Sequence, residues 1–347
     1  MTSRLQALAG GLKLPLLVTN LVNIRYLTGF DSSNAALLVR PKGEATLFTD
    51  FRYIETARAL DGVDVQLTKR SLISDLAERL SGRIQFEADV LPYLEWERLA
   101  AHKVNPVATT GIVERLRAVK DEEEIAAVRR AVRVADRAFE ALTAETWVGR
   151  SERELGWRLH ELLHAHGADA PSFEAIVAFG PNGARPHARP TETIVEPRSL
   201  VVVDWGAMVD GYASDCTRTV STGGGLPEKL REIYDVCRDA QQRACDGITA
   251  GMTGVEADAL ARDPITAAKW GPEFGHGLGH GVGLEVHEAP RLSTESTDVL
   301  ATGNVLTIEP GIYVEGVAGV RIEDLGVVRE DGVELLTSFP KALIEVS

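Results

Sequence analysis

Short apolar runs separated by turn-forming residues characterise the N-terminal part of the chain. The runs lie at residues 16–18, 36–39, 45–48, 63–67 and 84–86. Apolar runs of this length, bounded by Gly, Pro, Asn or Ser, are typical of β-strands. The intervening patterns at 51–60 and 74–80 predict helices, so this part of the chain is expected to form a compact α/β unit.

A long helical stripe begins after a charged segment at residues 115–124. Its apolar positions recur at alternating spacings of three and four: Ile125, Val128, Val132, Ala135, Phe139 and Leu142. This period predicts one buried helix face, and Asp121 with Glu124 three residues later forms a capping-box pattern at its start. We place a domain boundary just before this helix, which gives an N-terminal domain of residues 1–117 and a C-terminal domain of residues 118–347.

The C-terminal part mixes helical and strand patterns. Ser151 and Glu154 predict the start of a second helix, in which four leucines share one face. Strands are predicted at 175–179, 200–205, 305–308 and 325–328, and a long helix near 228–248. The C-terminal domain is therefore expected to be of the α+β class.

Composition excludes several classes of partner. With 347 residues, 44% of them hydrophobic, the chain is long enough for two packed domains. Lys and Arg number 37 against 51 Asp and Glu, and the net charge of -14 argues against binding to nucleic acid or an anionic membrane. The apolar run at 14–18 is too short for a signal peptide or a membrane helix, so a cytoplasmic location is expected. Three cysteines without CxxC spacing are expected to be buried free thiols.

Two aspartates, Asp204 and Asp215, provide the first chemical signal. Asp204 ends an apolar strand pattern. Because burial of an unpaired carboxylate costs several kcal/mol, such a residue is usually paired, protonated or bound to a metal. Gly206 and Gly211 predict a hairpin that returns Asp215 to the side of Asp204. Taken alone, a structural salt bridge explains this segment as well as a metal site does.

A glycine-rich segment, FGHGLGHGVGLEVHEAPR, carries His276, His280 and His287. Glycines this closely spaced indicate that the backbone approaches another group closely, such as an ion or a substrate. The pair His287-Glu288 superficially matches the zincin helix motif. The residue four positions after His287 is Arg291, however, and the surroundings are strand-like, so a zincin site is rejected.

Two glutamates complete a possible metal site. Glu309 follows the apolar strand pattern VLTI, and Glu323 lies between apolar residues in GVRIEDLG. Each acid alone could be a buried ion-pair partner. Four acids at strand ends, together with a histidine in a glycine-rich bend, favour divalent metal instead. Carboxylate-dominated ligands suit manganese, cobalt or zinc, and bridging carboxylates can hold two such ions roughly 3.5–4 Å apart.

The order and spacing of these residues resemble the pita-bread metallopeptidases, which include prolidase, aminopeptidase P, methionine aminopeptidase and creatinase. The family pattern falls on Asp204, Asp215, His280, Glu309 and Glu323. The resemblance implies that Asp204 chelates one ion and that His280 and Glu309 chelate the other. Asp215 and Glu323 would bridge both ions.

The resemblance extends over both parts of the chain. It implies an α+β pita-bread catalytic domain at residues 118–347. The segments NIRYLTGF and TDFRY also look like the noncatalytic α/β domain, of creatinase/prolidase type, that precedes it in prolidases and aminopeptidases P. Methionine aminopeptidases generally lack that domain and lack an arginine at the position of Arg321. The intact ligand set argues against creatinase-type relatives and against a binding module built on an inactive scaffold.

The resemblance also assigns roles to further residues. Glu309 is expected to accept a proton from the attacking water, and His287 to hydrogen-bond the tetrahedral intermediate. His187, in GPNGARPHARP, and His276 are expected to bind the substrate. Arg321 could bind the substrate or neutralise the acidic cluster, and both interpretations stay open.

The reaction that the resemblance implies is hydrolysis of the peptide bond before proline by a hydroxide activated by two metal ions. Proline has no N–H and a fixed backbone, so this bond needs a shaped pocket. A dipeptidase also needs a cation for the free carboxylate, and Arg189, Arg291 and Arg321 are candidates. The HEAPR segment favours an Xaa-Pro dipeptidase, whereas His276 favours the alternative, an Xaa-Pro aminopeptidase for longer peptides. The expected partners are small proline-containing peptides and, in a homodimer, a second copy of the chain.

Overall fold

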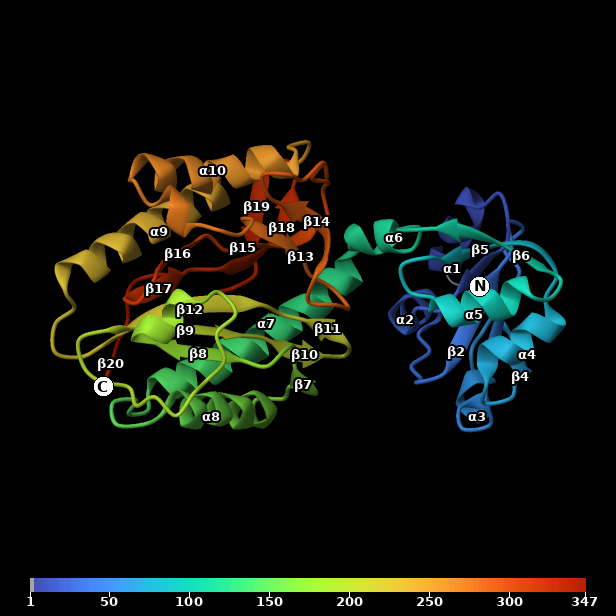
Figure 1. The fold of residues 1–347 in the computed structure, drawn as a ribbon, viewed down its shortest axis with the longest axis horizontal. Helices are drawn as coiled ribbons and strands as arrows, with labels where there is room; N and C mark the ends of the chain where they lie inside the picture. The colour runs from blue at the N-terminus through green and yellow to red at the C-terminus, as the bar shows by residue number, and fades with distance from the viewer. Residues whose placement is uncertain (1–2) are drawn as a thin grey trace. The chain divides into compact units, whose positions relative to one another are not determined.

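The chain divides into two compact units, Met1–Arg117 and Ala118–Ser347, and the computed structural model describes residues 3–347 of it. Each unit has its own sheets and its own hydrophobic core (Figure 1).

The first unit is built on a six-stranded sheet with the strand order β4-β3-β2-β1-β5-β6. Its strands are β1 (Leu16–Val18), β2 (Ala35–Val39), β3 (Ala45–Thr49), β4 (Asp64–Leu67), β5 (Gly82–Glu87) and β6 (Val104–Thr109). Its helices are α1 (Ser3–Gly11), α2 (Leu21–Thr28), α3 (Ile54–Ala57), α4 (Leu72–Arg79) and α5 (Tyr93–Ala100). A further short helix, α6 (Glu114–Ala118), ends at the boundary between the units. Leu17, Leu76 and Phe86 are among the side chains that fill the core of this unit.

The helix expected at residues 51–60 is wrong in its extent. Only Ile54–Ala57 is helical, and residues 51–53 form a turn. The buried carboxylate of Asp50 accepts hydrogen bonds from the backbone N–H of Arg52 and from its guanidinium. A short polar side chain that binds the backbone two residues ahead favours a turn over a helix.

The two larger sheets of the second unit lie between two pairs of helices (Figure 1). The first sheet has the order β20-β12-β9-β8, and the second has the order β14-β13-β15-β18-β19. The strands of the first sheet are β8 (Ile176–Phe179), β9 (Leu200–Trp205), β12 (Cys216–Thr222) and β20 (Glu345–Val346). Those of the second are β13 (Gly279–Gly281), β14 (Glu288–Leu292), β15 (Val305–Ile308), β18 (Asp324–Arg329) and β19 (Gly332–Leu335).

Smaller elements complete this unit. They are β7 (Ala170–Pro171), β10 (Ala207–Val209) and β11 (Tyr212–Ala213) in one small sheet, the hairpin of β16 (Gly311–Val314) and β17 (Ala318–Arg321), and the 3-10 turns η1 (Gly180–Ala184) and η2 (Gly271–Glu273). Helices α7 (Glu122–Thr143) and α8 (Glu152–Ala165) pack on the first sheet. Helices α9 (Glu228–Gly247) and α10 (Gly254–Ala267) pack on the second.

Helix α7 joins the cores of the two sheets. Its first half, including Ile125 and Val128, packs against Val305 and Leu325 of the second sheet. Its second half packs against the first sheet, where Phe139 stacks on Trp205 with ring centroids 3.9 Å apart. The predicted apolar stripe is confirmed, because all six of its residues are buried. Helix α7 therefore packs on both of the larger sheets.

The capping boxes predicted for the first two helices of this unit are confirmed. Asp121 accepts a hydrogen bond from the N–H of Glu124, and the side chain of Glu124 accepts one from the N–H of Asp121. Ser151 and Glu154 make the same reciprocal pair at the start of α8. Each box satisfies N–H groups that a helix cannot bond internally.

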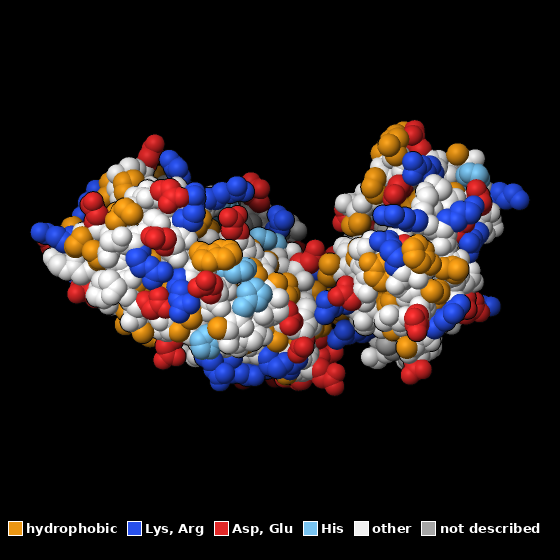
Figure 2. Space-filling view, turned by 90° about the horizontal axis from the view of Figure 1, so that it is seen from below, with side chains coloured by type: hydrophobic (Ala, Val, Ile, Leu, Met, Phe, Trp, Pro, Cys, Tyr) orange, Lys and Arg blue, Asp and Glu red, His pale blue; other side chains and the backbone are white. Residues whose placement is uncertain are grey.

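Histidine side chains gather on the face that α8 covers (Figure 2), where the ring of His160 stacks on the exposed Trp157.

Cys216, Cys237 and Cys245 are buried free thiols, as predicted. Among residues 3–347, no helix combines the length and the apolar character needed to cross a bilayer.

Candidate metal centre

Strand pairing in the first sheet brings Asp204 and Asp215 together. Asp204 is the fifth residue of β9, and Asp215 directly precedes β12. The two strands are antiparallel, with Thr217 opposite Asp204. The short β10–β11 hairpin lies between them in sequence, so the chain returns Asp215 to the end of β9 as the glycine pattern predicted.

The second sheet contributes two glutamates in the same way. Glu309 directly follows β15 and Glu323 directly precedes β18, and these strands are antiparallel with Ile308 opposite Asp324. The N–H of Glu323 donates to Thr217 O, which ties this sheet to β12. The carboxylates therefore meet where the ends of the two sheets join.

The glycine-rich segment brings His280 to the same place. His280 lies in β13, between β14 and β15. A side chain at Gly279 would collide with Thr307 O, and one at Gly281 would collide with Ala289 O. Close approach of the backbone is therefore confirmed as the reason for these two glycines. The groups that they approach are neighbouring strands, whereas the sequence suggested an ion or a substrate.

All five residues of the predicted ligand set lie in one cluster. Ligand oxygens of Asp204, Asp215 and Glu323 lie within 4.8 Å of one another. His280 Nε2 lies 3.2 Å from Glu309 Oε1 and 3.8 Å from Asp215 Oδ2. The carboxylates of Asp215 and Glu309 are only 7% and 17% exposed, so bulk water does little to screen their charges.

The electrostatics of this cluster are unfavourable without a cation. Burial and then the charge of Glu323 raise the pKa of Asp215 well above its ordinary value. Burial and then the charges of Glu309 and Asp204 raise the pKa of Glu323 in the same way. Burial also opposes ionisation of Glu309, but the hydrogen bond and charge of His280 lower its pKa to about 2. When carboxylates are held this close together, either a cation neutralises their charge or one of them keeps a proton.

Two oxygen atoms show that the cluster fits a metal. Asp204 Oδ1 and Glu323 Oε1 are buried and accept no hydrogen bond from any of residues 3–347. Buried acceptors of this kind are rare unless an ion or an ordered water completes their bonding. Four carboxylates and one imidazole are a ligand set that manganese, cobalt and zinc accept.

Arg321 is buried against the cluster. Its Nη2 donates to Asp204 Oδ2 over 2.6 Å, and its Nη1 donates to Tyr313 Oη over 2.8 Å and to Pro186 O. Its Nε donates to Thr217 Oγ1. These contacts favour neutralisation and positioning of the acidic cluster, one of the two interpretations that the sequence left open.

The other histidines of the predicted site occupy different positions. The ring of His287 lies 4.3 Å from that of His280, and burial together with the charge of His280 lowers the pKa of His287. His276 Nε2 lies 3.0 Å from Tyr313 Oη. His187 is exposed in the turn after η1, and its charge contributes to the lowered pKa of His287.

Arg291 occupies a position that differs from that of Arg321. It lies opposite His280 in the β13–β14 pair, and residues directly opposite in an antiparallel pair share a face. The side chain is exposed. Its charge contributes to the lowered pKa of His287.

Three polar residues of the site were not predicted from the sequence. Thr217 Oγ1 donates to Glu323 Oε2, and Thr307 Oγ1 donates to Glu309 Oε1. Tyr313 links His276 to Arg321. Both threonines lie two residues from a predicted ligand on a strand, and side chains two apart on a strand share a face. That spacing is the signal that could have identified them.

Comparison with known proteins identifies the family. The family model described as metallopeptidase family M24 matches residues 126–330, more than half of the chain. The chain belongs to metallopeptidase family M24. The model of the creatinase/prolidase N-terminal domain matches residues 3–119 of this M24 chain. The expected α+β catalytic domain and the creatinase/prolidase-type domain before it are therefore confirmed.

Similar proteins to this M24 peptidase include two named as Xaa-Pro dipeptidases and one named as an X-Pro aminopeptidase. The structure of an Xaa-Pro dipeptidase from Bacillus anthracis is 38% identical, covers 99% of both chains and has a TM-score of 0.95. An Xaa-Pro dipeptidase from Lactobacillus helveticus is 37% identical over 94% of this chain and 93% of its own. The structure of an X-Pro aminopeptidase from Thermotoga maritima MSB8 is 31% identical, covers 99% of this chain and 100% of its own, and has a TM-score of 0.89.

Proposed function

We propose that the chain is a metal-dependent Xaa-Pro dipeptidase, which hydrolyses the peptide bond before proline in dipeptides. The observation that carries the proposal is the buried cluster of four carboxylates and His280, in which two carboxylate oxygens have no partner among residues 3–347. Support for the substrate comes from relatives named as Xaa-Pro dipeptidases, which match nearly the whole chain.

The proposed metal ligands are Asp204, Asp215, His280, Glu309 and Glu323, which would hold two divalent ions such as manganese, cobalt or zinc. Bound ions of this kind polarise a peptide carbonyl and lower the pKa of water towards neutrality. All five ligands belong to residues 118–347, so we assign catalysis to the second unit and no catalytic residue to residues 1–117. The family resemblance also supports a homodimer, and a cytoplasmic location is proposed.

The chain's own residues supply the remaining chemistry. Glu309 lies beside His280 and accepts a hydrogen bond from Thr307, which fixes its carboxylate for proton transfer from the attacking water. His287, next to His280, is placed to donate to the developing oxyanion. His187 and His276 are proposed to bind the substrate.

The choice between a dipeptidase and an aminopeptidase depends on one cation. A dipeptide places its free carboxylate directly after the proline ring, whereas a longer peptide has an amide there. Arg291 is exposed opposite His280, while the Arg321 guanidinium is buried and donates to four groups of the protein. We propose Arg291 as the carboxylate anchor. The alternative, an Xaa-Pro aminopeptidase, draws on the position of His276 and on the similarity to the Thermotoga maritima aminopeptidase.

Peptide length provides the test of this choice. Leu-Pro, Leu-Pro-amide and Leu-Pro-Gly are compared as substrates of the manganese-loaded protein by chromatography of released leucine. We expect kcat/KM for Leu-Pro to exceed that for Leu-Pro-amide roughly 10- to 100-fold, because a hydrogen bond to a charged group contributes about 1.5–3 kcal/mol. Arg291→Gln should remove most of this difference. Faster turnover of Leu-Pro-Gly would favour the aminopeptidase.

A further inference from the structure

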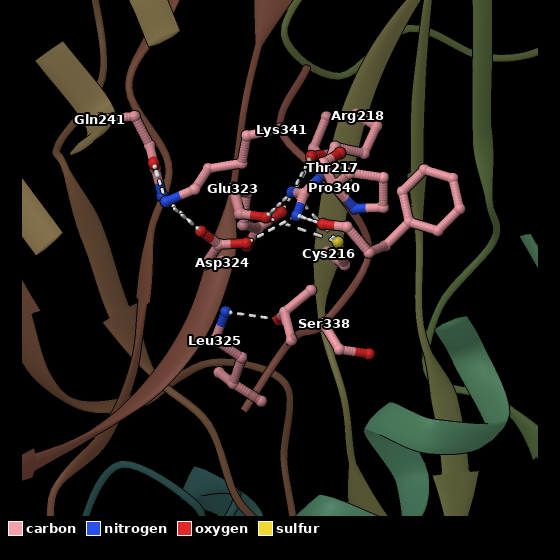
Figure 3. Close-up of polar contacts among 12 residues, drawn as sticks. Cys216, Thr217, Arg218, Gln241, Glu323, Asp324, Leu325, Ser338, Pro340 and Lys341 are labelled. Atoms are coloured by element: carbon pink, nitrogen blue, oxygen red, sulfur yellow. Dashed lines mark hydrogen bonds and ion pairs between the residues drawn. The ribbon is translucent and has the colours of Figure 1, made fainter. Parts of the chain in front are cut away.

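Arg218 is a buried cation that contacts several separate segments. It lies in β12, three residues after Asp215, and is only 2% exposed. Its Nε donates to Pro340 O, its Nη1 to Thr217 O and Glu323 O, and its Nη2 to Phe339 O and Asp324 Oδ1 (Figure 3). A guanidinium has five N–H groups, and these five oxygen acceptors, together with Cys216 Sγ at 3.5 Å from Nη1, leave none of them without a partner.

Asp324 extends this contact to helix α9. Its Oδ1 accepts the bond from Arg218, and its Oδ2 accepts from Gln241 Nε2 and Lys341 Nζ, each over 3.0 Å (Figure 3). Gln241 also accepts a bond from Lys341 through its Oε1. We call Arg218, Asp324, Gln241 and Lys341 the Arg218 network.

The Arg218 network reaches the backbone beside three of the proposed ligands. Arg218 binds the carbonyl of Glu323 itself and that of Thr217, two residues after Asp215. Gln241 Nε2 lies 3.3 Å from Ile308 O, directly before Glu309. These carbonyls belong to both sheets, so the network sets how the carboxylates of one sheet face those of the other.

Stability alone does not explain a network of this kind. Two charges removed from water lose several kcal/mol each in hydration, and well-packed hydrophobic residues often replace a buried ion pair without loss. The geometry of a metal site, by contrast, depends on groups behind the ligands that fix their orientation. Carboxylates with ligand oxygens within 4.8 Å of one another repel and need such support.

We infer that Arg218 is a positioning residue for the metal centre. It holds β18, which follows Glu323, and β12, which follows Asp215, at the separation that metal binding requires. Arg218 contacts neither metal nor substrate and acts through the backbone of the ligand strands. This role rests on the proposed function, because it assumes that the carboxylate cluster binds metal.

The test measures metal binding directly. Wild type, Arg218→Met and Arg218→Lys are freed of metal with a chelator and titrated with Co²⁺ by calorimetry and visible absorption. Arg218→Met should bind Co²⁺ roughly 10- to 100-fold more weakly, the usual effect of losing a group that orients a ligand. Lys341 still pairs with Asp324 in this variant, so the chain should fold. Arg218→Lys keeps the charge but not the planar fork, and should give an intermediate affinity.

Asp136→Asn is the matched control. Asp136 is buried and accepts two hydrogen bonds from Ser338, so it holds the same C-terminal segment as Arg218 but bonds to neither ligand strand. It should leave Co²⁺ affinity unchanged. Equal Co²⁺ affinity in wild type and Arg218→Met, or equal weakening in Asp136→Asn, would overturn the inference alone. A wild-type chain that binds no Co²⁺ would overturn the proposed function and this inference together.

Discussion

Asp215→Asn is expected to reduce kcat/KM for an Xaa-Pro dipeptide by roughly 10³-fold or more while the chain remains folded. A neutral amide is a weak ligand for a hard or borderline cation, and it removes one of the two residues proposed to bridge the ions. Metal-assisted stabilisation of a transition state is worth several kcal/mol, and about 4 kcal/mol corresponds to roughly 10³ in rate. The measurement is steady-state hydrolysis at saturating manganese.

The same variant should not destabilise the metal-free protein. Burial and then the charge of Glu323 raise the pKa of Asp215, so the metal-free folded chain loses stability as the pH rises from the ordinary carboxyl pKa through that raised pKa. Asparagine removes this charge, and the metal-free melting temperature at neutral pH should stay equal or rise. Asp210→Asn in the same hairpin is the control, because Asp210 is exposed and pairs with Arg130, outside the carboxylate cluster. Full activity in Asp215→Asn would contradict the two-metal proposal.

Glu309→Gln is expected to lower kcat by roughly 10²- to 10⁴-fold, the range that general acid–base catalysis contributes. Glutamine keeps the size of the side chain and can still accept the hydrogen bond from Thr307, but it cannot take a proton from water and is a weaker metal ligand than a carboxylate. KM should change much less than kcat, because the role proposed for Glu309 arises in the transition state.

Glu315→Gln provides the comparison for this effect. Glu315 is an exposed residue between β16 and β17, on the hairpin that follows Glu309, and its change should leave kcat and KM unaltered. Metal content of both variants is measured alongside the rates. A Glu309→Gln enzyme with normal metal content and normal kcat would exclude Glu309 as the proton acceptor.

Much of the second unit was predictable because its local signals agree with its packing. The capping pairs Asp121/Glu124 and Ser151/Glu154 identified the starts of α7 and α8, and the apolar strand patterns identified β9 and β15. Helix α10 was not predicted, although Thr253 and Glu256 form a capping box at its start. Pro264 lies inside that helix, and a proline ordinarily argues against a helix interior.

The acidic cluster was predictable from residue type and spacing, but its supporting contacts were not. A carboxylate after an apolar strand is a strong local signal, since burial of a lone charge is costly. Arg218 gave no such signal, because most of its acceptors are backbone carbonyls, and those of residues 323, 339 and 340 depend on how distant segments pack. Tyr313 acquires its role in the same way, through contacts made only in the folded chain.

The most direct measurement of the central claim is a metal titration of Xaa-Pro dipeptide hydrolysis. The protein is freed of metal with a chelator, and manganese is added back while bound metal and released proline are both quantified. The proposed function predicts no hydrolysis by the metal-free chain, and activity that rises as the chain binds up to two ions. Full hydrolysis of the dipeptide by a chain shown to hold no metal would contradict the account.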